Sequence, residues 1–315
     1  MSKTALLFAG QGAQKVGMGK DWAEQLPTAR SLFDRANDVL GYDLADLCFH
    51  GPEAELTKTE HAQPAIFLAG WVACQLLKEQ VPALSFEATA GLSLGEFTAL
   101  AAAGAMTFED GLRLVCQRGR FMQEACELTR GSMAAVIGLD EPHTRAVCAE
   151  AGVELANLNC PGQLVISGEA AQIARACELA KAKGARKAMP LPVAGAYHSR
   201  LMASAKLKLD DALAGIALAS PLVPVISNVT AQPHAAPHQV RALLVEQVTS
   251  SVRWEESMRY LLAQGFTRFI ELGPGTALSG FLKRIDERNQ RLNVADLASL
   301  EATVKALTIC HHVFP

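Results

Sequence analysis

The sequence of 315 residues has few charged side chains, and no segment concentrates charge of one sign. Only 19% of the residues are charged and the formal net charge is -3, whereas 50% are hydrophobic. Binding to nucleic acid requires clustered lysine and arginine, so nucleic acid is not an expected partner. The composition is that of a packed globular protein with one large core and room for a smaller additional unit.

Cysteine-pair motifs and long apolar segments are also absent. The eight cysteines form no C-x-x-C pair, and we expect reduced, mostly buried thiols. The longest strongly apolar run, over residues 65–74, is too short to cross a bilayer. Residues 1–12 have no charged leader followed by a long apolar stretch. We therefore expect a cytoplasmic protein without a membrane segment.

The order of apolar patterns predicts an α/β fold. Strands are expected over 4–9, 86–91, 223–229 and 266–272. The clearest helical spacings lie over 27–41, 62–79 and 108–129. Because strands and helices alternate, we predict a mainly parallel sheet covered by helices.

The pattern changes between residues 130 and 195. Here the order is strand, helix, strand, strand, helix, strand, which is the ferredoxin-like order. We therefore predict an inserted small subdomain over 130–195, and a catalytic core formed by 1–129 and 196–315.

The sharpest local motif is Gly91-Leu92-Ser93-Leu94-Gly95, which fits the G-x-S-x-G nucleophile elbow. In an elbow, the serine sits in strained backbone on a strand-to-helix turn, and flanking side chains would collide with neighbouring elements. The turn places the serine oxygen at a helix N-terminus, where the next N–H can face a developing oxyanion. The alternative is an ordinary serine in a tight turn.

A serine nucleophile needs a base, and His198 is the histidine best placed to supply it. It directly follows the predicted insert, and junctions between subdomains often form sites. A hydrolase triad would also need an acid between the two residues. Asp110 and Asp140 are the only aspartates there, and Asp140 is typical of a helix N-cap. We therefore expect a group other than a carboxylate to orient His198.

Arg118 lies in a predicted helix beside Gly119, a glycine that allows another segment to approach closely. A buried arginine needs an acidic partner. That partner is either an internal carboxylate or, if Arg118 faces the Ser93 pocket, a carboxylate of the substrate. A third reading is an arginine that reaches the surface, and the residues alone leave all three open.

Seven ordered motifs resemble those of malonyl-CoA:acyl-carrier-protein transacylases, from residue 6 to about 301. They are Gly10-Gln11-Gly12, GLSLGEFTAL, QRGRFMQ, NLNCPGQLVISG, GAYHSRLM, SVRWEESM and ELGPGTALSGFLKRI. The resemblance implies an α/β-hydrolase-like core with a ferredoxin-like insert. It also implies transfer of malonyl from malonyl-CoA to the phosphopantetheine thiol of an acyl carrier protein, for fatty acid synthesis.

The resemblance assigns roles to the reacting groups. Ser93 is the implied nucleophile and His198 its base. The backbone carbonyl of Gln247 is implied to orient His198, which supplies the acceptor that the aspartates did not. Gln11 and Leu94 are implied to offer backbone N–H groups to the oxyanion.

The resemblance also assigns the acyl pocket. Arg118 would bind the malonate carboxylate, Met122 and Tyr197 would line the pocket, and Asn159 would belong to the polar surroundings of the base. Two positions depart from the family pattern. Leu92 stands where the family usually has histidine, and Tyr197 stands where malonyl-selective members commonly have phenylalanine.

Alternatives of other classes stay open at this stage. A serine thioesterase or esterase would use the same elbow, but would need a triad carboxylate and no Arg118. A non-catalytic member would keep the fold alone. A malonyl transferase could also serve a polyketide or malonate decarboxylase carrier. No H-E-x-x-H or Cys/His ligand spacing is present, so we expect no metal and no cofactor, and we expect a monomer.

Overall fold

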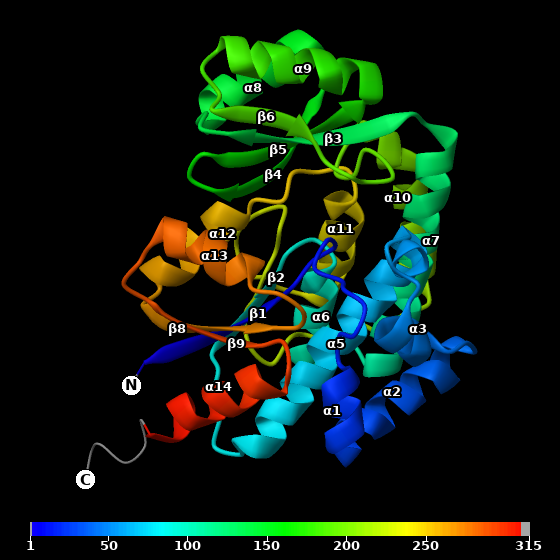
Figure 1. The fold of residues 1–315 in the computed structure, drawn as a ribbon, viewed down its shortest axis with the longest axis vertical. Coiled ribbons are helices and arrows are strands. Elements are labelled where there is room, and N and C mark those ends of the chain that lie inside the picture. The colour runs from blue at the N-terminus through cyan, green and yellow to red at the C-terminus, as the bar shows by residue number, and fades with distance from the viewer. Residues whose placement is uncertain (1, 310–315) are drawn as a thin grey trace.

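The computed structural model describes residues 2–309, so Cys310, His311 and His312 lie outside the described residues. Two sheets lie one above the other in the view of Figure 1, and helices pack against both. The larger sheet is parallel with strand order β7-β2-β1-β8-β9, which confirms the predicted mainly parallel sheet. Its strands are β1 (Lys3–Phe8), β2 (Ala88–Gly91), β7 (Val225–Ile226), β8 (Phe266–Leu272) and β9 (Gln290–Val294).

The helices around this sheet agree with the predicted periodicity where it is clearest. The helices expected over 27–41, 62–79 and 108–129 correspond to α2 (Pro27–Leu40), α5 (Thr59–Gln80) and α7 (Phe108–Leu128). The helices are α1 (Lys20–Gln25), α2 (Pro27–Leu40), α3 (Leu44–His50), α4 (Glu53–Leu56), α5 (Thr59–Gln80), α6 (Gly95–Ala102), α7 (Phe108–Leu128), α10 (Ala203–Ala214), α11 (Pro237–Gln247), α12 (Trp254–Ala263), α13 (Ala277–Ile285) and α14 (Leu297–Ile309). A 3₁₀ turn over Arg200–Met202 precedes α10.

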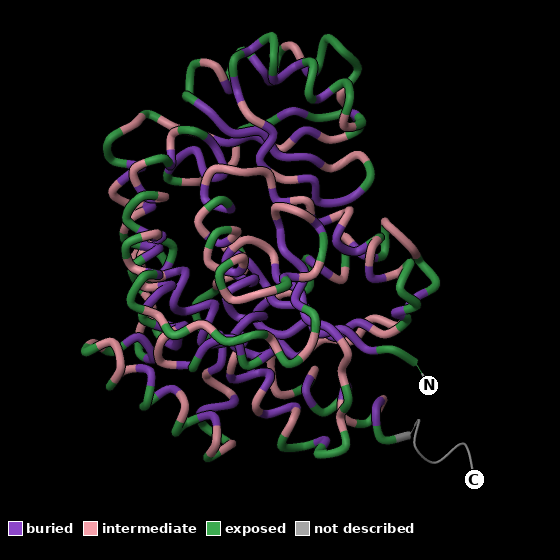
Figure 2. The backbone as a smooth tube through the Cα atoms, turned by 180° about the vertical axis from the view of Figure 1, so that it is seen from behind, coloured by how far each residue is buried: buried purple, intermediate pink, exposed green. Residues whose placement is uncertain are grey.

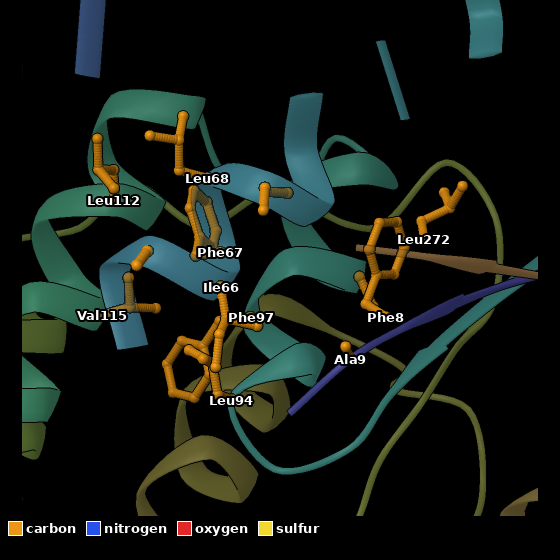
Figure 3. Close-up of a cluster of buried hydrophobic side chains, with 14 of the residues drawn as sticks. Phe8, Ala9, Ile66, Phe67, Leu68, Leu94, Phe97, Leu112, Val115 and Leu272 are labelled. Carbon is orange, nitrogen blue, oxygen red and sulfur yellow. The ribbon is translucent and has the colours of Figure 1, made fainter. Parts of the chain in front are cut away.

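The larger sheet is buried on both faces, as is usual for parallel sheets. Successive side chains of a strand point to opposite faces. Leu6 and Phe8 of β1 therefore join the apolar cluster of α5, α6 and α7, whereas Ala5 and Leu7 join that of α12 and α13. Figure 3 shows part of the first cluster, and the strands and inner helix faces are buried in Figure 2. The turn after β2, which carries Ser93, is therefore packed against a buried apolar core.

The smaller sheet is antiparallel with strand order β4-β5-β3-β6, and its two helices pack together at the upper end of Figure 1. Its elements are β3 (Gly131–Ile137), α8 (Glu141–Ala151), β4 (Glu154–Cys160), β5 (Gln163–Glu169), α9 (Ala170–Ala182) and β6 (Lys187–Pro190). This is the predicted ferredoxin-like arrangement. Asp140 caps α8 as predicted, accepting a hydrogen bond from the His143 N–H. The unit has its own apolar core, and the limits 130 and 195 stay a prediction.

Edge strand β4 ties the smaller sheet to the larger unit. The Leu158 N–H donates to the Val252 carbonyl at 2.9 Å, and the Val252 N–H donates to the Ala156 carbonyl at 2.8 Å. Met133 and Val165 of the smaller sheet also belong to the apolar core of the larger unit. These contacts fix the position of the smaller unit relative to the larger one, and a cavity lies between the two units.

The strand predicted over 223–229 is wrong in its extent. Only Val225–Ile226 pairs with β2, and the chain then turns, with the Ala231 N–H donating to the Ser227 carbonyl. The turn exists because Asn228 uses its side chain to bond the backbone of Ser93 and Gly91. A tertiary hydrogen bond has here replaced a continuation of the sheet.

Helices α5 and α7 pack closely because Gly119 has no side chain. A Cβ atom at residue 119 would lie 2.6 Å from the carbonyl oxygen of Thr59. The expectation that this glycine permits a close approach is confirmed. Because Thr59 begins α5 and Arg118 precedes the glycine on α7, the contact also sets the distance between two sides of the site.

We predict that Gly119→Ala lowers the free energy of unfolding by about 1–3 kcal/mol, because the added methyl group overpacks the helix contact. Gly280→Ala on α13 is the matched control, since a Cβ there meets nothing within 4 Å. The control should be neutral or stabilising by up to about 1 kcal/mol from helix propensity. Urea unfolding of both variants measures the difference, and equal stabilities would contradict the packing argument.

Candidate active site

Ser93 lies in the turn between β2 and α6, with a φ of 53°. Among the described residues, only Ser93, His198 and Ala231 are non-glycine residues with positive φ. A Cβ at Gly91 would lie 1.9 Å from the backbone carbon of Gly95, so the turn admits no side chain there. Such strain persists only where the surrounding structure over-determines it, and this is the geometry of a nucleophile elbow.

His198 meets Ser93 at the junction of the two units. Its Nε2 atom lies 2.8 Å from the Ser93 Oγ, and its Nδ1 atom lies 2.9 Å from the Gln247 carbonyl oxygen. Because a carbonyl can only accept, Nδ1 carries the proton, and Nε2 of the neutral ring is free to accept from the serine hydroxyl. The structure thus brings together Ser93, His198 and Gln247, the three residues to which the family resemblance assigns these positions.

Burial sets the protonation state of this histidine. Burial first, and then the positive charge of Arg118, lowers the pKa of His198 to about 4. Hydrogen bonds to backbone groups of Gln247 and Ser250 act in the opposite direction. The ring is therefore neutral at neutral pH, which is the form that a general base requires.

Arg118 is buried beside the nucleophile and is 1% exposed. Its guanidinium donates to the Gln63 Oε1 at 2.7 Å, the Gln247 Oε1 at 3.0 Å and the Ser93 Oγ at 3.3 Å. Burial lowers the pKa of Arg118 to about 10, so it remains a cation at neutral pH. It forms no salt bridge with any residue between 2 and 309, so the internal carboxylate considered above is wrong.

A cavity of about 520 Å³ opens in front of Ser93 and His198, between the two sheets. Its lining comes from both units. The residues predicted for the site that line it are Gln11, Ser93, Met122, Asn159, Tyr197 and His198. Leu92 also lines it, where the family usually has histidine. A cavity of this size, walled by two units and lined by Ser93 and His198, has room for a substrate arm.

Two backbone N–H groups are unpaired among the described residues, that of half-buried Gln11, which lines the same cavity as Ser93, and that of buried Leu94, which follows Ser93 in the chain. In the part of the chain that the structure describes, the N–H groups of Gln11 and Leu94 donate no hydrogen bond to another residue. Unpaired buried N–H groups are uncommon in folded proteins. Donors that flank a nucleophile in this way are suited to binding an oxyanion.

Tyr197 and Asn159 both line the cavity, but the polar group of Tyr197 is hydrogen-bonded whereas, within residues 2–309, the Oδ1 atom of Asn159 is not. The Tyr197 hydroxyl bonds the Thr59 hydroxyl at 2.5 Å, and burial raises the pKa of Tyr197 to about 12, so its polar tip is already paired. Asn159 forms no hydrogen bond with His198, although both line the cavity. Its Oδ1 atom is buried without a hydrogen-bond partner among the described residues.

Sequence reasoning missed four polar residues behind the serine. They are Gln63, Glu96, Asn228 and His234, each with relative exposure of 6% or less. The signal for Glu96 was an acidic residue in an otherwise apolar helix directly after the elbow. His234 lies in a stretch rich in proline and alanine, and Asn228 fell inside the overlong predicted strand, so neither was distinguishable by pattern.

Several features concern the described residues as a whole. Seven cysteines are free and six of them are buried, as expected. Over 2–309, no helix combines the length and apolar character that a bilayer span needs. No group of three or more His, Cys, Asp or Glu side chains in that range is arranged to hold a metal ion. The absence of a cofactor stays a prediction.

The acyl transferase domain family matches residues 5–302 of the chain. A malonyl CoA-acyl carrier protein transacylase of Bacillus subtilis is 45% identical to it, over 98% of each sequence. The chain belongs to the malonyl-CoA:acyl-carrier-protein transacylase family. The transacylase structure from Coxiella burnetii matches with a TM-score of 0.94 and 37% identity, over 98% of both chains. A malonyl-transacylase solved in complex with a type II polyketide acyl carrier protein matches with a TM-score of 0.94 and 39% identity, over 97% of this chain and 100% of that one.

The low pKa of His198 leads to a prediction for this transacylase-family site. The base is active when neutral, so Ser93 reactivity should be constant between about pH 6 and 8 and fall only near pH 4. A histidine with the ordinary pKa of about 6.5 would lose about fourfold by pH 6. The rate of Ser93 labelling by a sulfonyl fluoride, followed by intact mass, measures this. Ser93→Ala is the blank, and an inflection near pH 6.5 would contradict the prediction.

Proposed function

We propose that this protein is an acyl-carrier-protein S-malonyltransferase that carries the malonyl group on Ser93. The observation that carries the proposal is Arg118, a buried cation to which no carboxylate of the described residues is directly bonded, and whose guanidinium donates to the Ser93 Oγ at 3.3 Å. A buried cation requires an anionic partner. A malonyl group on Ser93 brings a carboxylate to this position, whereas an acetyl group does not.

The first half-reaction forms the acyl-enzyme. The Ser93 Oγ attacks the thioester carbonyl of malonyl-CoA as its proton passes to the His198 Nε2. The developing oxyanion is held by the N–H groups of Gln11 and Leu94. When the tetrahedral species collapses, the carbon–sulfur bond breaks, and the coenzyme A sulfur takes the proton from His198. The products are malonyl-Ser93, free coenzyme A thiol and a neutral histidine.

The second half-reaction runs through the same groups in reverse. The phosphopantetheine thiol of the carrier protein enters the cavity and gives its proton to the His198 Nε2. The thiolate attacks the malonyl ester, the bond to the Ser93 Oγ breaks, and the serine recovers the proton. Because the new thioester resembles the old one, the enzyme needs no energy source and no redox cofactor.

The geometry favours transfer over hydrolysis by an ordinary esterase. His198 is oriented by the Gln247 carbonyl, and the buried acid nearest to the elbow, Glu96, contacts His234 instead. An esterase for neutral acyl groups has no use for the buried cation Arg118. Fatty acid synthesis is the proposed pathway, as the sequence resemblance implies, and the names of the bacterial relatives support an acyl carrier protein as the acceptor. A polyketide carrier is the second candidate partner, since a close structural neighbour was solved with one.

The proposal predicts a malonyl adduct that depends on two residues. Wild-type protein mixed with malonyl-CoA should gain one malonyl group by intact mass, and Ser93→Ala should gain none. Arg118→Ala should form the adduct about 10- to 100-fold more slowly, because a hydrogen bond to a charged group contributes about 1.5–3 kcal/mol. Its reaction with acetyl-CoA should change little.

The matched control is Arg120→Ala. Arg120 lies on the same helix as Arg118, but its side chain is 59% exposed. It should behave as wild type with both thioesters. Steady release of coenzyme A without an adduct would identify a thioesterase instead. Equal loss of malonyl and acetyl transfer in Arg118→Ala would remove Arg118 from acyl selection.

A further inference from the structure

A carboxylate is buried behind the nucleophile, on the side away from the cavity. Glu96 is the second residue of α6 and its side chain is fully buried. Its Oε1 atom lies 2.7 Å from the His234 Nε2, also on a fully buried side chain. Its Oε2 atom accepts from the Gln247 Nε2 at 2.7 Å and from the Asn228 N–H at 3.0 Å. Both carboxylate oxygens are therefore used inside the protein.

Asn228, one of the residues that Glu96 anchors, clamps the elbow. Its Oδ1 accepts from the Ser93 N–H at 2.6 Å, and its Nδ2 donates to the Gly91 carbonyl at 2.8 Å. The amide thus bridges the backbone on both sides of Leu92. A clamp of this kind can hold a serine in the left-handed region against its strain.

Gln247, the other anchored residue, reaches all three functional groups. Its Nε2 donates to the Ser93 carbonyl at 3.0 Å, its Oε1 accepts from Arg118, and its backbone carbonyl orients His198. Rotation of this side chain would release both the Ser93 carbonyl and the guanidinium. The Glu96 Oε2 atom is a fixed acceptor that holds the amide in this rotamer.

We propose that Glu96 is a positioning residue, whose buried carboxylate sets the mutual geometry of Ser93, His198 and Arg118 through Asn228 and Gln247. The inference rests on the malonyl transfer proposed above and extends it to a residue that does not touch the substrate. Two amides anchored at one oxygen cannot move independently. The nucleophile, its base and the acyl-binding cation are thereby coupled at a single point.

Glu96 also acts on the charge of the site. Its negative charge raises the pKa of Arg118 against the effect of burial. The Gln247 amide lies between the two groups, donating to Glu96 and accepting from Arg118. The charge of the guanidinium is therefore partly offset without a direct salt bridge, an effect secondary to the hydrogen bonds that fix the geometry.

Two substitutions of Glu96 separate the effect of its side-chain length from the effect of its negative charge. Glu96→Gln keeps the length of the side chain, and its amide oxygen can still accept from both Asn228 and Gln247. Glu96→Asp keeps the charge but withdraws the acceptor by one methylene. Thr89→Val is the matched control, because it removes a buried hydrogen bond between β2 and α6 without touching either amide.

The experiment measures kcat and KM for malonyl transfer to a phosphopantetheine thiol, and the rate of Ser93 labelling by a sulfonyl fluoride. Thermal midpoints show that each full-length variant is folded. We expect Glu96→Gln to stay within about threefold of the wild-type kcat. Glu96→Asp should lose about 30-fold or more, because misplacement of reacting groups by about 1 Å can cost 100-fold. KM for malonyl-CoA and the Thr89→Val activity should stay near wild type.

Each other outcome has a distinct meaning. Wild-type activity in Glu96→Asp, an aspartate variant faster than the glutamine variant, or an equal loss in Thr89→Val would overturn the positioning role. If wild-type protein takes no malonyl but its Ser93 labelling follows the expected order, the proposed function fails and the role of Glu96 stands. If malonyl transfer occurs and both Glu96 variants match wild type in both assays, only the role of Glu96 fails.

Discussion

The left-handed backbone of Ser93 is the constraint around which the site is built. A non-glycine residue in this region costs on the order of 1–3 kcal/mol and must be held by its surroundings. Here the Ser93 N–H is bound by Asn228 and its carbonyl by Gln247. The flanking residues Gly91 and Gly95 are packed too tightly to carry side chains. The strain lifts the hydroxyl out of the sheet and toward His198.

Burial of charge is the second physical theme. His198 is neutral because charging it would be unfavourable in a buried site beside a cation. Arg118 keeps its charge with amide and hydroxyl partners, and Glu96 compensates it from behind Gln247. The insert contributes to this arrangement, since residues of its sheet form one wall of the cavity. The same burial that lowers the pKa of His198 also encloses Ser93.

Much of this protein follows from its sequence by local physics. The alternation of strands and helices predicted the parallel sheet, and the order of elements from 130 to 195 predicted the ferredoxin-like insert. The glycines around Ser93 predicted the elbow, because a tight turn leaves a clear mark in residue type. Gly119 predicted a close helix contact for the same reason. The pairing of His198 with the Gln247 carbonyl came only from the family resemblance.

Tertiary structure decided what no local pattern records. The Asn228 clamp, the burial of His234 and the convergence on Glu96 join residues more than 130 positions apart in the chain. Strand β7 ends at Ile226, and Asn228, two residues later, uses its side chain at the elbow rather than continuing the sheet. Backbone strain and glycine spacing are local and can be read from the sequence. Hydrogen-bond partners of buried polar groups are set by the packing of distant segments, and they appear only when the chain has folded.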